Sequence, residues 1–370
     1  MTKHTLYVGL DTAKNSIAVA VAGPLPFGAV RTWGKIANTP AAVDRLIGKL
    51  RGEGRAIKVC YEAGPCGYGL HRQLAAMAGV TCVVAAPSLI PRAPGERVKT
   101  DRRDALKLAT LLRAEEIVSV WVPDRAHEAM RDLVRSRAMA VEDLTRCRQR
   151  IGGFLLRQGI AYIGKPWTKT HRGWLGSLAF EHAAQRVMVA EFLAALDQAA
   201  ARRDRLTESI AELVPAWSLA WLVEALQALR GYRLIHAATL AAEIGDPRRF
   251  DNPRQLMAFV GLVPSEYTTA ERVRRGPITK TGNRRARKVL IEAAWSYARA
   301  AKGGAITAPP AIAAIAEKAR HRLSRRYRRL VAKGRRAPVA VTAIARESLG
   351  FVWAIARAAA PPAGGPRSQP

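Results

Sequence analysis

The sequence predicts a mixed α/β domain at its N-terminal end, followed by long helices. Short apolar runs typical of strands alternate with amphipathic helical segments up to Pro123, after an opening pair of strands. Beyond Ala126, apolar residues recur at spacings of three and four, which indicates long amphipathic helices. With 370 residues, of which 49% are apolar, the chain is long enough for two or three domains with a substantial core.

The first domain is expected at residues 1–123. It opens with "TLYVGLDTAKNSIAVAVAG", which reads as two strands joined by a turn at Lys14 and Asn15. A third short strand is expected at 29–33 and a helix at 41–51. The strand "AIKVCYEAG", a helix at 68–77, a strand at 80–86 and a helix from Asp104 onward complete the domain.

The segment 124–218 is expected to be helical, with a coiled-coil pattern. A long amphipathic helix starts at Ala126, and a loop rich in glycine and tryptophan is expected at 159–176. From 189 to 213 the apolar residues follow a heptad seam that is broken only at Arg203. Both a helical hairpin within one chain and a dimerising coiled coil fit this seam.

The C-terminal part divides by charge. Residues 219–305 are expected to form a compact, mostly helical domain, and 306–360 a basic helical tail. Ten of the nineteen residues from Lys318 to Arg336 are Lys or Arg, and none is acidic, so we expect this tail to bind nucleic acid. The last residues, 361–370, are expected to be a disordered end.

The net charge of +31, from 60 Lys and Arg against 29 Asp and Glu, indicates a polyanionic partner. Nucleic acid fits best, since the longest uncharged run, 73–91, contains glycine and prolines and is a poor membrane span. The opening residues lack a long apolar stretch, so no secretory signal is expected. The four cysteines show no CxxC pairing, which argues against a zinc site and a disulfide framework and favours a reduced, cytoplasmic setting.

Two aspartates three residues apart stand out in "VKTDRRDALKLATLLRAEE". Asp101 and Asp104 would share one face of a helix, with Lys99, Arg102 and Arg103 beside them. Convergent carboxylates repel each other unless a cation such as Mg²⁺ lies between them. The alternative is that Asp101 caps the helix and Asp104 pairs with a neighbouring cation.

Two further acids, Asp11 and Glu62, each close an expected core strand, where an uncompensated charge is costly. Together with Asp101 and Asp104 they make four carboxylates around one sheet. A two-metal nuclease site needs such acids, which hold cations about 4 Å apart. The sequence therefore predicts a site for Mg²⁺ or Mn²⁺, with Lys99, Arg102 and Arg103 facing phosphates.

Longer motifs accompany these acids: "YEAGPCGYGLHRQL", "APSLIPRAPGERVKTDRRDALKLATLLR", "VWVPDRAHEAMRDLVRSR", "FDNPRQLMAFVGLVPSEY" and "GPITKTGNRRARKVLIEAAWSYAR". With the order D…E…DxxD, they resemble the DEDD transposases of the insertion-sequence-110 family, in particular its 1111-type branch. The resemblance runs from about Tyr7 to Arg357. It implies a RuvC-like RNase H fold at the N-terminus, a coiled-coil middle, a second transposase domain and a structured non-coding bridge RNA that guides the enzyme.

The resemblance also implies site residues. The four acids of the family fall on Asp11, Glu62, Asp101 and Asp104. Its nucleophilic serine falls within "PSEYTTAERVRRG", where Thr268 and Thr269 stand in place of serines and Ala270 in place of glycine. Thr269 is the expected nucleophile, and Thr268 is the adjacent alternative.

The predicted function is that of an insertion-sequence transposase, which cuts and rejoins DNA with divalent metal and a hydroxyl nucleophile. The expected partners are DNA (element ends and target), a guide RNA and further copies of the chain in a dimer or tetramer, with no membrane. The alternatives are a decayed transposase that only binds nucleic acid, and a RuvC-type structure-selective nuclease. The other residues expected to contact nucleic acid are Arg274, Arg275, Lys280, Arg284, Arg285, Arg325, Arg326, Arg328 and Arg329.

Overall fold

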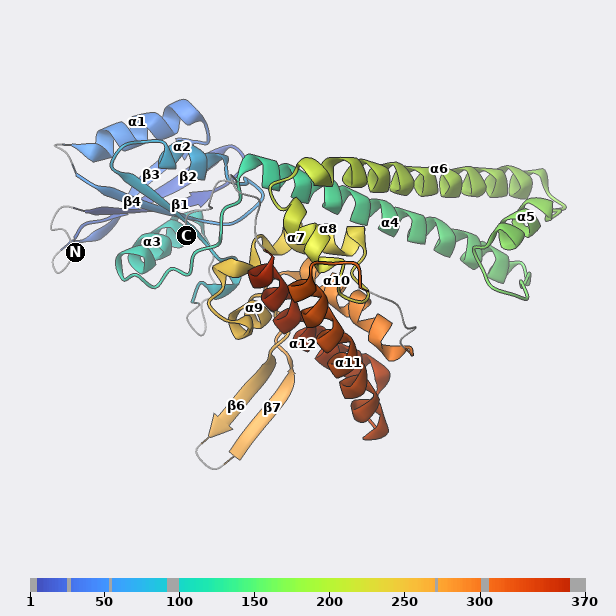
Figure 1. Cartoon of the computed structure of the whole chain (residues 1–370). Helices are drawn as coiled ribbons and strands as arrows, with labels where there is room; N and C mark the ends of the chain where they lie inside the picture. Colours follow the sequence, from blue (N-terminus) through green and yellow to red (C-terminus); the bar gives the residue numbers. More distant parts are fainter. Residues whose placement is uncertain are drawn as a thin grey trace. The chain divides into compact units, whose positions relative to one another are not determined.

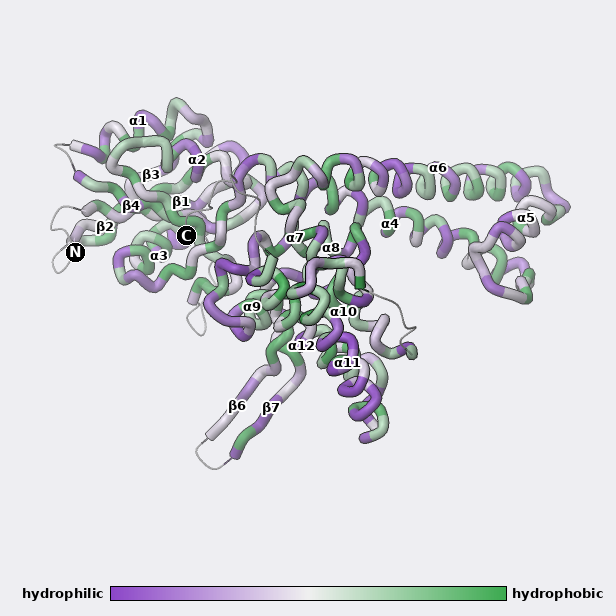
Figure 2. The backbone as a smooth tube through the Cα atoms, in the orientation of Figure 1, coloured by the Kyte–Doolittle hydropathy of each residue, from purple (hydrophilic) through white to green (hydrophobic). Residues whose placement is uncertain are grey.

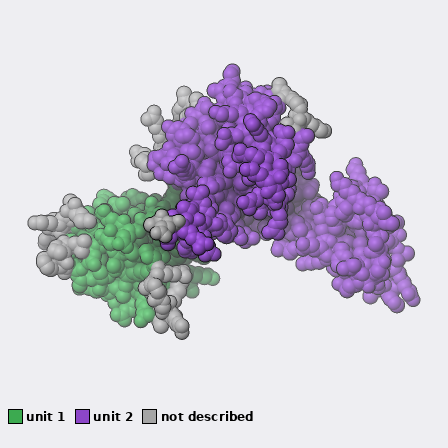
Figure 3. Space-filling model, turned by 90° about the horizontal axis from the view of Figure 1, so that it is seen from below, with its two compact units in different colours: residues 1–123 green, residues 124–370 purple. Residues whose placement is uncertain are grey.

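The computed structural model describes residues 5–24, 28–52, 55–91, 100–269, 272–300 and 306–359. The chain forms two compact units, residues 1–123 and 124–370 (Figures 1 and 3). The first combines a sheet with helices, and the second is mostly helical. The α/β class predicted for the N-terminal part is therefore confirmed. Lys99, Ala270 and the end expected to be disordered, 361–370, lie outside the described residues.

The first unit is built on a mixed sheet with the strand order β3-β2-β1-β4-β5. Strands β1, β2 and β3 are antiparallel neighbours, whereas β4 runs parallel to β1 and β5 runs parallel to β4. The central strands are almost fully buried, as their near-continuous apolar sequences predict. The strand bounds are Leu6–Thr12, Ser16–Ala22, Val30–Ala37, Ile57–Glu62 and Val80–Ala85 for β1 to β5.

Helices cover both faces of this sheet (Figure 1). Val8, Leu10 and Val59 face the apolar side of α1 (Pro40–Arg51), with α2 (Gly69–Ala75) on the same face. The other face is covered by α3 (Asp101–Arg113), and a short helical turn, η1, spans Pro87–Leu89.

Two expectations for this unit need correction. Helix α3 begins at Asp101 and not at Asp104, because the Thr100 side chain caps it by accepting a hydrogen bond from the Arg103 amide (3.3 Å). Asp101 is therefore the first helical residue and not the cap. The third strand is also longer than expected, since it continues to Ala37 along β2.

The second unit contains a two-helix arm. Helices α4 (Arg125–Arg157) and α6 (Ala183–Leu213) lie side by side within one chain, so the helical hairpin is the observed form (Figure 1). At the tip, α5 (Lys169–Ser177) occupies the C-terminal part of the segment expected to be a loop, and Thr168 caps it. The tip has its own core, formed by Leu144, Ile151, Phe154, Leu155, Leu175, Phe180 and Leu196.

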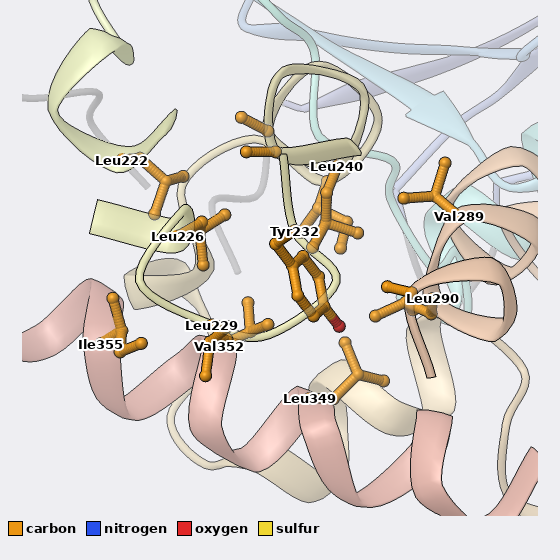
Figure 4. Packing of buried hydrophobic residues seen from close by; sticks show 14 of the residues in the cluster. Leu222, Leu226, Leu229, Tyr232, Leu240, Val289, Leu290, Leu349, Val352 and Ile355 are labelled. Atoms are coloured by element: carbon orange, nitrogen blue, oxygen red, sulfur yellow. The ribbon is translucent and has the colours of Figure 1, made fainter. Parts of the chain in front are cut away.

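The rest of the second unit shares one large core. Its helices are α7 (Ala220–Leu226), α8 (Leu234–Ile244), α9 (Pro253–Phe259), α10 (Arg284–Ala294), α11 (Pro310–Ala332) and α12 (Ala337–Ala358), with short turns η2 (Val214–Ala216), η3 (Pro247–Arg249) and η4 (Trp295–Ala298). The ring of Tyr232 lies among Leu229, Leu290 and Leu349 (Figure 4), and its hydroxyl contacts Ser348 Oγ at 3.0 Å. A hairpin of β6 (Pro264–Thr269) and β7 (Arg272–Ile278) projects from this core.

The segment expected as a basic tail belongs to the same core. Helix α12 has a predominantly apolar sequence, and its buried residues pack with those of α7, α8 and α10. Helix α11 buries one apolar stripe, Ile312, Ala316, Ala319 and Leu323, and hydrophilic residues alternate with apolar ones along it (Figure 2). Helix α12, and the bent pair 183–216 and 220–226 taken together, are long and apolar enough to cross a membrane. The core helix of a globular domain can be equally long and apolar, and half of the most apolar stretch of α12 is buried within the unit.

Candidate active site and nucleic-acid interface

Asp11 and Glu62 lie at the same edge of the sheet. Leu10 of β1 is level with Tyr61 of β4, and each acid follows directly after this pair. Leu10 and Tyr61 pack on the α1 face, so Asp11 and Glu62 point to the opposite face, which α3 covers. Both acids are half-buried. The alternation of side chains along each strand and the parallel pairing of β1 with β4 thus bring the carboxylates of Asp11 and Glu62 to the same place.

Helix α3 lies directly on these strands because Gly9 has no side chain. A Cβ at Gly9 would stand 2.2 Å from the carbonyl oxygen of Ala105 and 2.4 Å from the amide nitrogen of Ala109. The thiol of Cys60 also donates to the Leu108 carbonyl at 3.3 Å. The register between helix and sheet is therefore closely fixed.

The first turn of α3 is at the same edge as Asp11 and Glu62. Asp11 is level with Ala18, and Ala18 is level with Lys35, so the three form one row across β1, β2 and β3. The ammonium of Lys35 contacts Asp101 Oδ2 at 2.7 Å. The structure thus brings the first turn of α3, with Asp101 and Asp104, to the row of Asp11.

The donor chemistry at this edge suits a hard divalent cation, because all four groups are carboxylates. Among the residues that the structure describes, no three acids, histidines or cysteines form a ready-made metal shell. Lys35, which the sequence did not single out, holds Asp101, and both side chains are at least half exposed. Exposed pairs of this kind contribute little to stability and exchange easily. Arg102 and Arg103 are exposed on the same turn.

The two threonines of β6 are on opposite faces of the hairpin. Thr268 pairs with Val273, and Thr269 pairs with Arg272. The Thr268 hydroxyl donates to Glu266 Oε1 at 2.7 Å, and Arg275 lies 3.5 Å from the other oxygen of Glu266. The hydrogen bond from Thr268 and, to a smaller extent, the contact with Arg275 lower the pKa of Glu266. The Thr268 hydroxyl therefore faces an ionised carboxylate, which would repel a phosphate.

Thr269 shares its face of the hairpin with Arg272, Arg274 and Tyr267. All four side chains are exposed, and Tyr267 is 79% exposed. Two guanidinium groups beside a hydroxyl are well suited to hold a phosphate next to it. Of the two threonines, Thr269 is the one that shares its face with two arginines.

The base of the hairpin is held by two glycines in the left-handed region. A Cβ at Gly261 (φ +69°) would stand 1.9 Å from the Thr281 carbonyl oxygen, and one at Gly282 (φ +76°) would stand 2.0 Å from that of Phe259. Arg287 donates to the carbonyls of Val260 (2.7 Å) and Thr281 (3.1 Å). The two ends of the hairpin are thereby fixed to each other.

A buried carboxylate then ties this base to the arm. Glu243 of α8, 3% exposed, accepts two hydrogen bonds from Arg135 of α4 (2.7 and 2.8 Å) and one from Asn283 (2.8 Å). Asn283 also caps α10 by accepting from the amides of Arg285 and Ala286, both at 3.0 Å. Burial alone would raise the pKa of Glu243, but the hydrogen bonds from Arg135 and Asn283 outweigh it and lower that pKa.

We expect Glu243→Gln to destabilise the protein by about 2–3 kcal/mol, less than the 3–5 kcal/mol of a fully buried pair because Arg135 is 37% exposed. A carboxyl with a lowered folded pKa stabilises above its ordinary pKa and loses that effect as pH falls through the folded value. Denaturant unfolding at pH 7 and pH 3 should therefore show a smaller deficit at pH 3 than at pH 7. In a control, Glu317→Gln removes contacts with Arg320 and His321 within one helix, where the carboxylate is 37% exposed and not buried, and should destabilise less. A deficit of equal size at both pH values would contradict this account.

The basic surface of α11 contains arginines of two kinds. Arg325, Arg328 and Arg329 are exposed, whereas Arg326 contacts Glu347 of α12 at 2.7 Å. Arg326 therefore has a structural partner within the unit. Of the other predicted contacts, Arg284 and Lys280 are exposed and Arg285 is half-buried, at or just before the start of α10. Lys280 adopts φ +57°, which its place in the tight turn before Gly282 requires.

We expect Arg325→Gln, Arg328→Gln and Arg329→Gln together to weaken DNA and RNA binding and to flatten its salt dependence. Each lost phosphate contact lowers the log–log slope by roughly 0.7–0.9, so the triple variant should lose about 2 to 2.7. Titrations over a range of salt concentrations measure this slope. Arg326→Gln, the matched control, should leave the slope nearly unchanged. An unchanged slope in the triple variant would mean that these arginines only face solvent.

Comparisons with known proteins give results for both units. Residues 223–308 match the family model described as "Transposase IS116/IS110/IS902 family", and residues 8–159 match one described as "Transposase", of the DEDD and IS110 type. A putative transposase (y4qE) of Sinorhizobium fredii is 47% identical over 95% of this chain and 89% of its own length. The transposase for insertion sequence element IS1533 of Leptospira borgpetersenii is 31% identical over 90% of this chain and 98% of its own length. That for element IS1111A of Coxiella burnetii is 34% identical over 77 residues.

Proposed function

This chain belongs to the IS110 family of transposases, and we propose that it moves an insertion sequence by cutting and rejoining DNA with divalent metal and the hydroxyl of Thr269. The observation that carries the proposal is the edge of the sheet where Asp11, Glu62 and the first turn of α3 meet. The hairpin supports it, because Arg272 lies opposite Thr269 and Arg274 is on the same face.

A DEDD transposase requires a divalent metal, and Asp11, Glu62, Asp101 and Asp104 are the residues that would hold it. Carboxylates select hard cations, so Mg²⁺ or Mn²⁺ is the metal that we propose. When bound, such ions stabilise the attacking and leaving oxygens of a phosphoryl transfer. The mixed sheet with acids at one edge supports a RuvC-like RNase H fold for residues 1–123.

Thr269 provides the nucleophile in this scheme. Its Oγ forms a bond to phosphorus as the bond from phosphorus to one deoxyribose oxygen breaks, and that oxygen leaves with a proton. Arg272 and Arg274 neutralise the phosphate while this occurs. A hydroxyl of the new partner strand then attacks the same phosphorus and releases Thr269, so the bond energy is conserved without ATP.

We propose that a structured non-coding RNA guides the choice of donor and target DNA. The net charge of +31 and the arginines of α11 support binding of more than one nucleic acid. Strand exchange also involves two DNA partners, so a dimer or tetramer is the working form. The setting is the prokaryotic cytoplasm, at the nucleoid when the enzyme is active.

A strand-transfer assay tests the proposal. The full-length protein is incubated with DNA that contains the element ends, with and without Mg²⁺ and an RNA transcribed from the flanking non-coding segment. We expect a denaturant-resistant protein–DNA product and rejoined DNA only when metal is present, and a strong stimulation by the RNA. Cleavage without a covalent product would favour the plain nuclease, and binding without cleavage would favour the decayed transposase.

A further inference from the structure

The tip of the α4–α6 arm, residues 144–180, carries no acidic residue. A stretch of this length would hold about three acids at the average density of the chain, 29 in 370. Arg146 and Arg172 are paired with Asp143 and Asp197 on neighbouring parts of the arm. The remaining cations are Arg148, Arg150, Arg157, Lys165 and Lys169, and all except Arg148 are exposed. Residues 144–180 are therefore strongly positive. Residues 181–200, which include the part of α6 that packs against them, add three acids and one arginine, so residues 144–200 together hold eight Lys or Arg against three acids.

Aromatic rings gather on the same tip. His171 is buried at their centre, with ring centroids 4.5 Å from Tyr162, 5.0 Å from Trp167 and 5.6 Å from Trp174. Its Nδ1 accepts from the Trp167 amide at 3.1 Å, and burial lowers its pKa, so the ring is neutral with its proton on Nε2. The three outer rings are only half-buried. Each of them combines a packed part with a part that faces solvent.

Trp167 is held in a strained backbone conformation. Its φ of +62° lies in the left-handed region, which a bulky side chain rarely adopts and which costs about 1–3 kcal/mol. The Arg148 guanidinium lies over the ring, 5.3 Å from its centroid. Such strain persists where the surroundings demand it, most often at sites that bind ligands. The ring thus packs partly against the tip core and partly under the guanidinium of Arg148.

An apolar side chain projects beside this cluster. Ile163, between Tyr162 and Gly164, is 98% exposed, although isoleucine is normally found in cores. Lys165 follows two residues later and is also exposed. An exposed apolar side chain beside a cation suits the face of an unpaired base next to its phosphate.

We propose that the arm tip is a separate binding surface for an unpaired nucleic-acid strand. Lys165 and Lys169 hold phosphates, and bases stack on Trp167 and against Ile163. A duplex covers the faces of its bases, so aromatic and apolar groups at the tip would find no partner there, whereas an unpaired strand offers them. The inference rests on the proposed function only in that nucleic acid is the partner of this protein.

Two variants of the full-length protein test the arm tip. Trp167→Leu keeps an apolar side chain but removes the ring, and it should weaken binding of a labelled oligo-uridine about 5- to 150-fold, since stacking contributes about 1–3 kcal/mol per base. Lys165→Gln with Lys169→Gln should lower the single-strand salt slope by roughly 1.4. Lys49→Gln with Arg55→Gln removes the same charge from exposed positions of the first unit and should leave the slope unchanged. Affinity for a duplex should not respond to Trp167→Leu.

Photo-crosslinking locates the contact independently of any variant. Oligo-uridine that contains 4-thiouridine should crosslink to peptides within 159–177. Crosslinks confined to α11 or the β6–β7 hairpin would overturn the arm-tip proposal and leave the proposed function intact, whereas a protein that crosslinks to no nucleic acid would contradict the proposed function itself. Three other results would also overturn the arm-tip proposal. Trp167→Leu could weaken duplex binding as much as single-strand binding. The tip could bind anionic vesicles and not the strand, or it could mediate a self-association that the lysine variant abolishes. If Trp167→Leu unfolds the tip, the salt slope of the lysine variant and the positions of the crosslinks still test the arm-tip proposal.

Discussion

Asp11→Asn is expected to lower strand cleavage by about a thousandfold or more, because the metal ions stabilise the transition state by several kcal/mol and each 1.36 kcal/mol is tenfold in rate. An amide keeps the size of the side chain but not its charge, so the affinity for the cation falls. Asp11 closes β1, far in sequence from the basic arginines of α11, so DNA binding should remain close to that of the wild type. Cleavage and binding are measured on the same labelled substrate.

The matched control is Glu116→Gln. Glu116 lies just after the C-terminal end of α3 and is exposed. Its replacement by glutamine removes the same charge from the same unit. Its cleavage rate should equal that of the wild type. Calorimetric titration with Mn²⁺ adds a readout that does not depend on activity, since Asp11→Asn should weaken metal binding and Glu116→Gln should not. Full cleavage by Asp11→Asn would show that the acids at the sheet edge are not the metal ligands.

Much of this edge was predictable because strand pairing follows short-range rules. Apolar residues on either side of Asp11 and Glu62 indicated core strands that end in an acid, and parallel neighbours bring such ends together. The start of α3 was less certain, since Thr100 and Asp101 are both residues that favour the capping position. Lys35 was missed because its contact with Asp101 depends on the register of three strands at once.

The second unit was less predictable, for physical reasons that differ between elements. The hairpin β6–β7 is polar and exposed on both faces, so it lacks the alternation that marks a half-buried strand. Helix α5 contains Gly173 and Gly176 and is preceded by Gly159 and Gly164, and glycines in this number favour a loop. The contacts of Glu243 with Arg135 and Asn283 join segments 108 and 40 residues apart, and no local pattern encodes them.

Thr269→Ala is expected to eliminate the covalent protein–DNA product and all rejoined DNA, because it removes the aliphatic hydroxyl opposite Arg272 that attacks phosphorus. Thr269→Ser should keep or raise the yield, since it removes only a methyl group that crowds the in-line approach to phosphorus. Thr268→Ala is the control next in sequence, on the opposite face of the strand, where its hydroxyl is bound to Glu266. We expect it to retain most of the product.

The three variants and the wild type together separate the possible functions in one denaturing-gel assay. If the chain is a decayed transposase, the wild type forms no adduct and Thr269→Ser restores it, because the methyl group alone blocks attack. If the chain is a plain nuclease, water is the nucleophile, and cleavage survives in Thr269→Ala without any adduct. If Thr268 attacks, the loss occurs in Thr268→Ala instead. If the hydroxyl of Thr269 is the nucleophile, the wild type, Thr269→Ser and Thr268→Ala all form an adduct, and Thr269→Ala forms none. An adduct in Thr269→Ala would end the assignment.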